Sequence, residues 1–394
     1  KVDISEVYPR LGESRKIRIQ VKPDAADIEY NKKIRGKLNH QDVYINIING
    51  SRLDRIHPDL LGLTVLLLIA PMSKRRIELN IPVSDGFKQS TARSGLIHVD
   101  SPTDASLARR EVPVKPRPGL AFSGGVDSCA ALLLMPIQTV PVFLHRQPPP
   151  NSGLSNYSDS AALLSCEKVL EAGYDLQCIG TSLEYIRKPV GNPVDWSNSA
   201  PAVVNADGLA LDSISFGMIA ESAYWTGGDY FSDLKTRGRY AAWAPVFDYC
   251  HIPISLPTAS LSEVITQKIC LIAGQHLAPQ SCIRGSAMKP CGHCFKCFRK
   301  GLVESALRKT KQDTAVWHAL TRGSEVAKKV LEVPIHHEIV IAWALNNCQC
   351  AESEVFRRLL EKLGPVCGYG HSLSFLEKYY PDGIEYTAPS MRDG

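Results

Sequence analysis

Apolar and polar residues alternate in three segments of the first third of the chain: Lys16–Val21, Val43–Ile48 and Arg76–Val83. Alternation of this kind predicts half-buried strands. A continuous apolar stretch, Leu60–Met72, has the length of a helix. Residues 84–118 are rich in Ser, Asp, Arg and Pro, which predicts a linker. Together these patterns predict a small N-terminal α+β domain over residues 1–115.

From Gly119 onward, short apolar segments alternate with segments of helical length. The predicted strands are Leu120–Phe122, Val140–Leu144 and Asp175–Thr181; the predicted helices are Val126–Met135, Asp159–Ala172, Asn205–Tyr224 and Ser260–Ala273. This alternation predicts a parallel sheet with helices on both faces. After Cys297 the pattern is helical throughout. We expect an α/β domain over residues 116–305 and a helical C-terminal extension over residues 306–394.

The composition is that of a globular chain, with 44% hydrophobic and 22% charged residues among 394. No apolar run reaches the roughly 18–20 residues of a membrane span, so we expect no membrane association. The formal net charge of +5 is mild. It does not indicate a nucleic-acid partner, although it does not exclude one.

A glycine-rich string joins the first of these strands to its helix: Ala121-Phe122-Ser123-Gly124-Gly125-Val126-Asp127-Ser128. The glycines let the backbone approach an anion, and the first amides of the helix can donate to a phosphate. The hydroxyls of Ser123 and Ser128 add donors. Asp127 would repel a phosphate, so we expect it to cap the helix, to shape the loop as an acceptor, or to bind Mg²⁺. The lysine of a Walker loop is absent.

The string S-G-G-V-D-S resembles the pyrophosphate loop of the N-type ATP pyrophosphatases, the PP-loop superfamily. The resemblance implies a doubly wound parallel sheet of the adenine nucleotide alpha hydrolase-like kind, with ATP at the carboxyl ends of its strands. It implies cleavage of ATP between the α- and β-phosphates, with Mg²⁺. By the same resemblance residues 121–128 bind ATP, Ser123, Asp127 and Ser128 are catalytic, and His145 lies near the adenine.

Four of the twelve cysteines crowd into one short segment: Cys282, Cys291, Cys294 and Cys297. A disulfide framework would suit a small secreted domain, so a metal site in a reducing, cytoplasmic setting is favoured. Four thiolates close a tetrahedral, structural Zn²⁺ site. A [4Fe–4S] cluster held by three cysteines, or free thiols, are the alternatives. His293 could replace one thiolate.

The glycine-rich loop followed by S-C-x8-C-G-x-C-x2-C and the pair Arg299-Lys300 is similar to the QueC family of 7-cyano-7-deazaguanine synthases. That similarity implies adenylation of 7-carboxy-7-deazaguanine, with zinc holding the C-terminal segment near the substrate. Residues 226–233 loosely resemble the family's substrate loop. The candidate substrate residues are Gly228, Asp229, Asp233, Arg237 and Lys268.

The segments outside the two motifs resemble in outline the enlarged QueC-like proteins of antiphage operons of the type IV CBASS and Qat kinds. This resemblance implies transfer of the activated acyl group to a protein amine, with a protein partner docked by the terminal domains. The alternatives are synthesis of 7-cyano-7-deazaguanine with ammonia, tRNA thiolation or sugar amidotransfer by a PP-loop enzyme, and an inactive ATP-sensing subunit of a defence complex. A homodimer is a further expectation.

Overall fold

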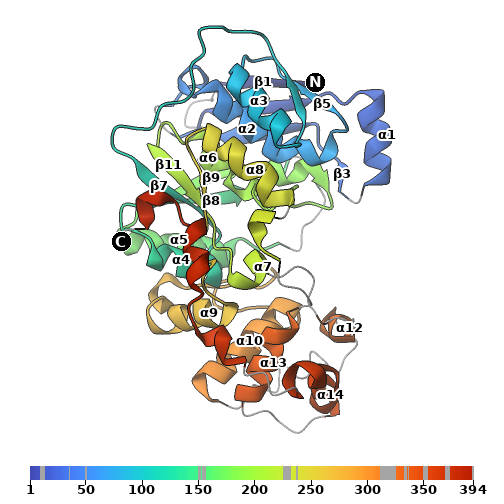
Figure 1. Cartoon of the computed structure of the whole chain (residues 1–394), viewed down its shortest axis with the longest axis vertical. Helices are drawn as coiled ribbons and strands as arrows, with labels where there is room; N and C mark the ends of the chain where they lie inside the picture. The colour runs from blue at the N-terminus through green and yellow to red at the C-terminus, as the bar shows by residue number, and fades with distance from the viewer. Residues whose placement is uncertain are drawn as a thin grey trace.

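The computed structural model describes residues 1–8, 14–34, 36–48, 51–149, 152, 157–224, 232–236, 238–310, 325–331, 335, 337–348, 354–368 and 373–392. The described residues form a central eight-stranded sheet with the order β1-β2-β4-β9-β8-β7-β11-β12 (Figure 1). Its strands are β1 (Val2–Val7), β2 (Lys16–Val21), β4 (Asp42–Asn46), β7 (Arg117–Phe122), β8 (Val140–Arg146), β9 (Gln177–Thr181), β11 (Leu211–Ser215) and β12 (Ile254–Ser255). Two smaller pairs join β5 (Arg76–Glu78) to β6 (His98–Asp100) and β10 (Arg187–Lys188) to β3 (Lys37–Leu38).

The strands from β9 to β12 in this order run parallel to one another. β7 comes first of them in the chain, with β8 and β9 following on one side and β11 and β12 on the other. The winding therefore reverses between β7 and β11, and such a switch point is where open α/β sheets bind ligands. The prediction of a mixed α/β fold with a mostly parallel sheet is confirmed at this level.

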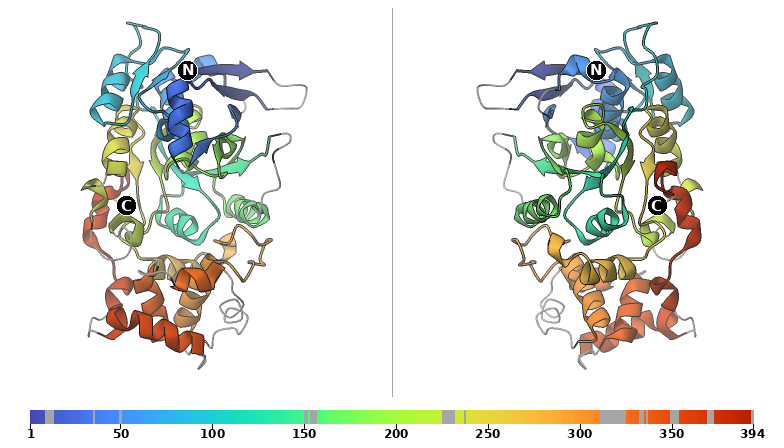
Figure 2. Two further views of the ribbon diagram at one scale, coloured as in Figure 1. Left: turned by 90° about the vertical axis from the view of Figure 1, so that its right-hand side faces the viewer. Right: turned by 90° about the vertical axis from the view of Figure 1, so that its left-hand side faces the viewer.

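Helices cover both faces of the parallel strands (Figures 1 and 2). On one face, Leu120 and Phe122 pack with α4 (Val126–Leu134), α5 (Ser160–Glu171) and α9 (Glu263–Ile272). On the other face, Ala121 packs with α2 (Pro58–Ile69), α6 (Ala200–Val204) and α8 (Gly238–Tyr249). Neighbouring residues of β7 face opposite sides of the sheet, as they do in any strand. The residues on both sides are apolar because helices bury both faces.

The N-terminal region extends the same sheet instead of packing as a separate layer. β4 pairs antiparallel with β9 at Ile45 and Thr181, and the Tyr44 amide donates to Ser182 Oγ at 2.9 Å. The apolar residues of β1, β2 and β4 belong to one buried cluster with those of the central strands. The predicted domain boundaries stay predictions, but residues 1–115 share both sheet and core with the region that follows.

The predicted linker over residues 84–118 is wrong in part, because it contains α3 (Asp85–Arg93) and β6. The Ser84 hydroxyl caps this helix by accepting from the Phe87 amide at 3.2 Å, and the Phe87 side chain is fully buried. Only a narrow face of this helix is buried, so most of its residues are polar and the segment has the composition of a linker.

The predicted helix Asn205–Tyr224 is also wrong. The segment holds strand β11 and helix α7 (Ala220–Tyr224), with Gly217 between them. β11 has only five residues and its apolar Leu211 and Ile214 lie three positions apart, so its pattern could not be distinguished from a helical one. β11 pairs with β7 and forms one side of the switch point, so this strand helps to position the candidate site.

The C-terminal helices are α10 (Phe295–Arg308), α12 (Glu325–Leu331), α13 (Glu338–Asn347) and α14 (Glu354–Gly368), which gather around a buried cluster of their own. The last described residues then run back to the sheet (Figure 2), where Leu256 donates its amide to the Tyr386 carbonyl at 2.8 Å. Helix α1 (Ala25–Lys33) lies at the opposite, N-terminal end.

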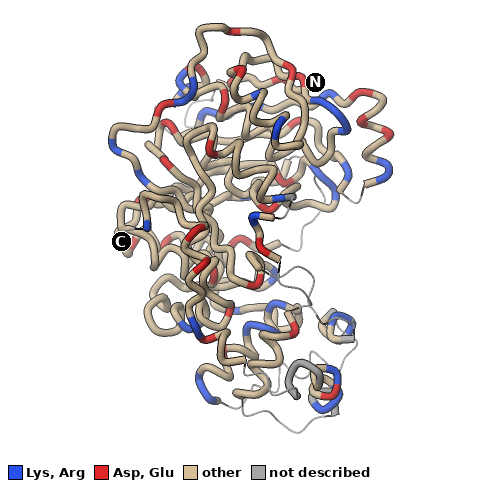
Figure 3. Tube along the Cα trace, in the orientation of Figure 1, with Lys and Arg blue, Asp and Glu red and all other residues tan. Residues whose placement is uncertain are grey.

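Lys and Arg are interspersed with Asp and Glu along the described trace (Figure 3). None of the described helices combines the length and apolar character that crossing a lipid bilayer requires.

Candidate functional site

The glycine-rich loop lies at the carboxyl end of β7, next to the switch point. Gly125 is the N-cap residue of α4 and has no side chain that could cap the first amides of this helix. Gly124 has φ +70°, and a Cβ there would lie 2.9 Å from the Cα of Ala162 in α5. A left-handed backbone pressed against another helix requires glycine. The loop is therefore held in one conformation between β7 and α5.

The two serines of the loop brace it from inside. The hydroxyls of Ser123 and Ser128 lie 3.0 Å apart. Ser128 Oγ donates to the Gly125 carbonyl at 3.0 Å and accepts from the Ser123 amide at 3.3 Å. These contacts fix the spacing of the loop amides, which is what a phosphate-binding turn needs.

The loop opens into a cavity of about 1240 Å³. Of the predicted ATP-binding residues, Ala121, Ser123, Gly125, Asp127 and Ser128 line it, whereas Phe122 and Val126 are buried behind the loop. The opposite wall comes from the end of β11, at Phe216 and Met218, and from residues 192–198. A Cβ on Gly217 would lie 2.7 Å from the backbone of Asp127, so the two sides of the switch point touch directly.

Asp127 acts as the hydrogen-bond acceptor that shapes the loop, one of the three predicted roles. Its Oδ1 accepts from Thr266 Oγ1 of α9 at 2.8 Å and from Lys300 Nζ of α10 at 3.0 Å. Lys300 is buried and its Nζ also lies 3.2 Å from Glu263 Oε1. Burial lowers the pKa of Lys300, but the Asp127 and Glu263 carboxylates reverse that effect and raise it overall. The negative charge beside the loop is thus compensated.

A network of buried charged groups continues behind Asp127. Glu263 forms an ion pair with Arg299 at 2.9 Å, and its amide donates to both carboxyl oxygens of Glu221 at 3.0 Å. Although burial opposes ionisation, Lys300 and Arg299 lower the pKa of Glu263 to about 2. Burial, together with the charge of Glu263, raises the pKa of Glu221 to about 8. One carboxyl of this pair is therefore ionised and the other protonated at neutral pH.

Sequence reasoning missed Glu263, Thr266 and Glu221 as parts of the site. Glu263, Thr266 and Gln267 stand at positions i, i+3 and i+4 of a helix whose other residues, apart from exposed Lys268, are apolar. That spacing places them on one helical face, and a polar stripe on a buried helix was the available signal.

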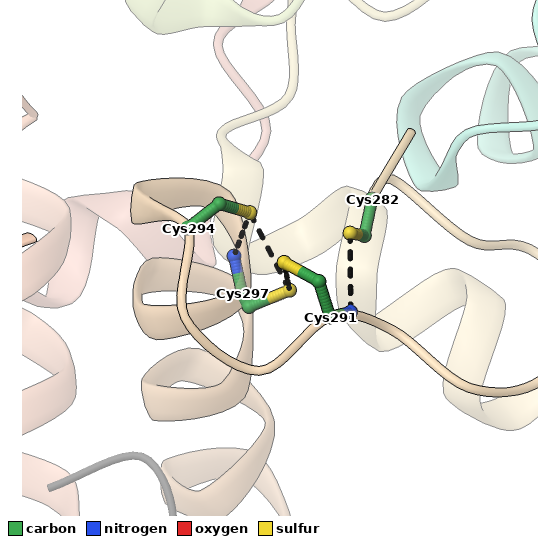
Figure 4. Close-up of side chains that lie close together, drawn as sticks. All are labelled: Cys282, Cys291, Cys294 and Cys297. Carbon is green, nitrogen blue, oxygen red and sulfur yellow. Dashed lines mark hydrogen bonds between the residues drawn. The ribbon is translucent and has the colours of Figure 1, made fainter. Parts of the chain in front are cut away.

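The four predicted metal ligands converge (Figure 4). The sulfur atoms of Cys291 and Cys294 lie 3.8 and 3.5 Å from that of Cys297, and all four sulfurs lie within 4.8 Å of one another. Bonds of about 2.3 Å in a tetrahedral zinc site place sulfurs about 3.8 Å apart. Exposed His293 turns its Nδ1 to the Cys291 carbonyl at 2.8 Å. The donor set is therefore four thiols, which could bind zinc.

The cysteine-bearing loop docks on the glycine-rich loop. The Gln280 amide donates to the Gly124 carbonyl at 3.0 Å, and the Val126 amide donates to Ser281 Oγ at 3.3 Å. Gln280, Ser281 and Ile283 line the cavity on either side of Cys282. Lys296, between two of the cysteines, lines it as well. The cysteine-bearing segment thus forms one wall of the cavity at the glycine-rich loop.

The other predicted residues lie outside this wall. His145 Nε2 contacts Asp159 Oδ2 at 3.1 Å and is not among the described residues that line the cavity. Asp233 accepts from the Tyr386 hydroxyl and from the Lys235 amide, and Lys268 is exposed on α9. Gly228, Asp229 and Arg237 lie outside the described residues.

The C-terminal part of the chain, residues 242–394, matches the model of a family of unknown function, DUF6395. No curated protein and no solved structure matches the chain. The matched region supplies the cysteine loop, Lys296, Lys300 and Glu263, whereas the glycine-rich loop precedes it.

Gly124→Ala should destabilise the protein more than Gly95→Ala. Both glycines have a left-handed backbone, with φ +70° and +66°, but only Gly124 faces another chain segment, since nothing lies within 4 Å of a Cβ at Gly95. Overpacking typically costs about 1–3 kcal/mol, which is the expected difference in the free energy of unfolding. Denaturant unfolding followed by circular dichroism measures both. Equal losses would show that the loop can move away from Ala162.

Cys291→Ser should lose metal and lower the unfolding midpoint, because structural zinc contributes directly to folding. The wild-type protein should carry about one zinc ion per chain by elemental analysis. Cys178→Ser is the matched control, since that thiol lies on β9 away from the cluster. If Cys291→Ser kept the zinc content of the wild type, the assignment of four thiols as metal ligands would be wrong.

Glu221→Gln should flatten the pH dependence of stability. With a folded pKa of about 8, Glu221 keeps its proton where the unfolded carboxyl, with a pKa of about 4.3, has lost it. Its contribution is complete below the unfolded pKa and is lost as the pH rises towards 8. Glutamine does not titrate but can still accept from the Glu263 amide. Unfolding free energies at pH 5 and pH 8 test this, and identical pH slopes in the two proteins would refute it.

Proposed function

We propose that this protein is a QueC-like, ATP-dependent enzyme of the PP-loop type. It adenylates a carboxylate, 7-carboxy-7-deazaguanine or a similar acid, releases pyrophosphate and transfers the acyl group to a nitrogen nucleophile. The observation that carries the proposal is the glycine-rich loop at the switch point, opening into a cavity of about 1240 Å³. Ordinary ligand pockets measure about 300–1,000 Å³, so this cavity has room for a nucleotide and a second substrate.

The electrostatics of the loop support an anionic ligand. Gly125, Asp127 and Ser128 at the N-terminus of α4 line the cavity, and helix N-termini favour anions. Asp127 would oppose a phosphate, but Lys300 lies 3.0 Å from its Oδ1. The Asp127 carboxylate is also an oxygen donor of the kind that Mg²⁺ prefers, and a bound ion would neutralise phosphate charge.

The reaction balances without any further reactant. An oxygen of the acid attacks the α-phosphorus, the bond between the α- and β-phosphates breaks, and pyrophosphate leaves. A nitrogen nucleophile then adds to the acyl carbon, AMP leaves with the electrons of the C–O bond, and the nitrogen loses a proton. The loop amides stabilise the charge that grows on the departing pyrophosphate, and Ser123 and Ser128 hold those amides in place.

The far half of the cavity suits a planar heterocyclic acid. Trp196 and Phe216 form its apolar wall, with their ring centroids 4.9 Å apart. Asn198 also lines the cavity and brings an amide side chain, which can both donate to and accept from the edge of a heterocycle.

A nitrogen nucleophile is favoured over sulfur. The thiols nearest the loop, Cys129 and Cys270, are buried behind it. Burial raises the pKa of Cys270 to about 12, so it supplies no thiolate for sulfur transfer. We propose a protein amine as the acceptor, in an antiphage defence system, with the terminal regions docking the partner.

The purified protein should form AMP and pyrophosphate from ATP only when 7-carboxy-7-deazaguanine is present. The products are separated from ADP and phosphate by chromatography, with and without ammonia. Turnover that stalls after one cycle with or without ammonia supports a protein acceptor, whereas sustained nitrile formation with ammonia would instead support 7-cyano-7-deazaguanine synthesis. Absence of AMP under every condition would refute adenylation of this acid.

Asp127→Asn is the matched test of the loop in the same assay. It should lower turnover by roughly a hundredfold or more, because the loop amides that stabilise transition-state charge would lose the carboxylate that positions them. Asp175→Asn serves as the control. Asp175 precedes β9 at the amino ends of the parallel strands, away from the glycine-rich loop, and pairs with Arg117. Wild-type turnover in Asp127→Asn would place the chemistry elsewhere.

A further inference from the structure

Most cations near the cavity already have a carboxylate partner. Lys300 contacts Asp127 and Glu263, and Arg299 contacts Glu263. Arg239 lies 3.1 Å from Asp195, and Lys235 is paired with Glu385. These cations are engaged before any ligand enters.

Lys296 differs from them. It lines the cavity, its side chain is accessible to solvent there, and among the described residues none forms an ion pair or hydrogen bond with it. Arg299 and Lys300 lie on the same helix but already pair with carboxylates, so an anion in the cavity can meet Lys296 without breaking an ion pair. A phosphate chain on the glycine-rich loop would supply the missing anion.

The position of Lys296 is set by the cysteine cluster. It sits in the first turn of α10 between Cys294 and Cys297, whose sulfurs lie 3.5 Å apart. The Cys294 sulfur accepts from the Cys297 amide at 3.4 Å, which fixes the backbone on both sides of Lys296. The same loop contacts Gly124 and Val126 of the glycine-rich loop.

We propose that Lys296 is the cation that binds the β- and γ-phosphates of ATP, delivered to the glycine-rich loop by the metal-binding turn. It takes the part that a lysine within the loop takes in Walker-type sites. The affinity for triphosphate and pyrophosphate then depends on occupancy of the four-cysteine site. This inference rests on the proposed function of the loop as an ATP site.

Calorimetric titration with Mg²⁺-ATP and with inorganic pyrophosphate, in the absence of any acid substrate, tests the inference. Lys296→Gln should weaken both affinities roughly tenfold to a hundredfold, the usual range for a hydrogen bond to a charged group. Lys296→Arg should remain within about threefold of wild type, because it keeps the charge. Lys289→Gln is the matched control: this lysine belongs to the same loop but is not among the described residues that line the cavity. Zinc content is measured for each variant.

The two proposals fail differently. If wild type binds ATP and Lys296→Gln binds it as tightly as Lys289→Gln does, the role of Lys296 is overturned and the loop remains an ATP site. If wild type binds neither ATP nor pyrophosphate, the proposed function falls.

A second measurement needs no variant, so it decides the matter even if Lys296→Gln loses zinc or fails to fold. Lysine acylation of the wild-type protein is followed by mass spectrometry with and without ATP. ATP should protect Lys296 and leave Lys289 unchanged. Equal acylation of Lys296 in both samples would overturn the inference.

Discussion

The arrangement of the candidate site depends on the buried ammonium of Lys300. It extends from α10 and lies 3.0 Å from Asp127 on α4 and 3.2 Å from Glu263 on α9. Removing such an ion from water costs several kcal/mol, which its partners offset only while they stay in contact. Three helices from distant parts of the chain must therefore assemble together. Any shift between them would leave a buried charge without compensation.

The same constraint accounts for the unequal behaviour of two neighbouring carboxyl groups. Lys300 and Arg299 provide two positive charges, which Asp127 and Glu263 balance. Burial, together with the charge of Glu263, raises the pKa of Glu221 to about 8, so a third ionised carboxylate is disfavoured in the same enclosed space. The network behind the loop is consequently neutral near pH 7. An anion that enters the cavity meets the helix N-terminus and Lys296 rather than a surplus of acidic groups.

The sequence was sufficient to locate those parts of the site that are local in the chain. A strand, two glycines and a helix that follow one another directly in the chain predicted the loop, and the spacing of the four cysteines predicted their convergence. The contacts of Asp127 were not predictable in the same way, because Thr266 and Lys300 lie more than a hundred residues away. β11 was missed because its apolar residues, Leu211 and Ile214, have a helical spacing, while the strand itself is defined by its neighbours in the sheet. The N-terminal strands were predicted. The pairing of β4 with β9, however, joins distant parts of the chain, and no local pattern reveals it.

A metal ion bound by the four cysteines would influence the cavity without lining it. Residues 279–293 contain no described helix or long strand, and their contacts with the glycine-rich loop are single hydrogen bonds from Gln280 and to Ser281. Such bonds contribute only about 1 kcal/mol each, too little to hold an irregular segment in one position. Four sulfurs converging on one ion would supply the missing rigidity, because they would tie this segment to the start of α10. One coordination geometry would then set a wall of the cavity, the docking of the glycine-rich loop and the placement of Lys296.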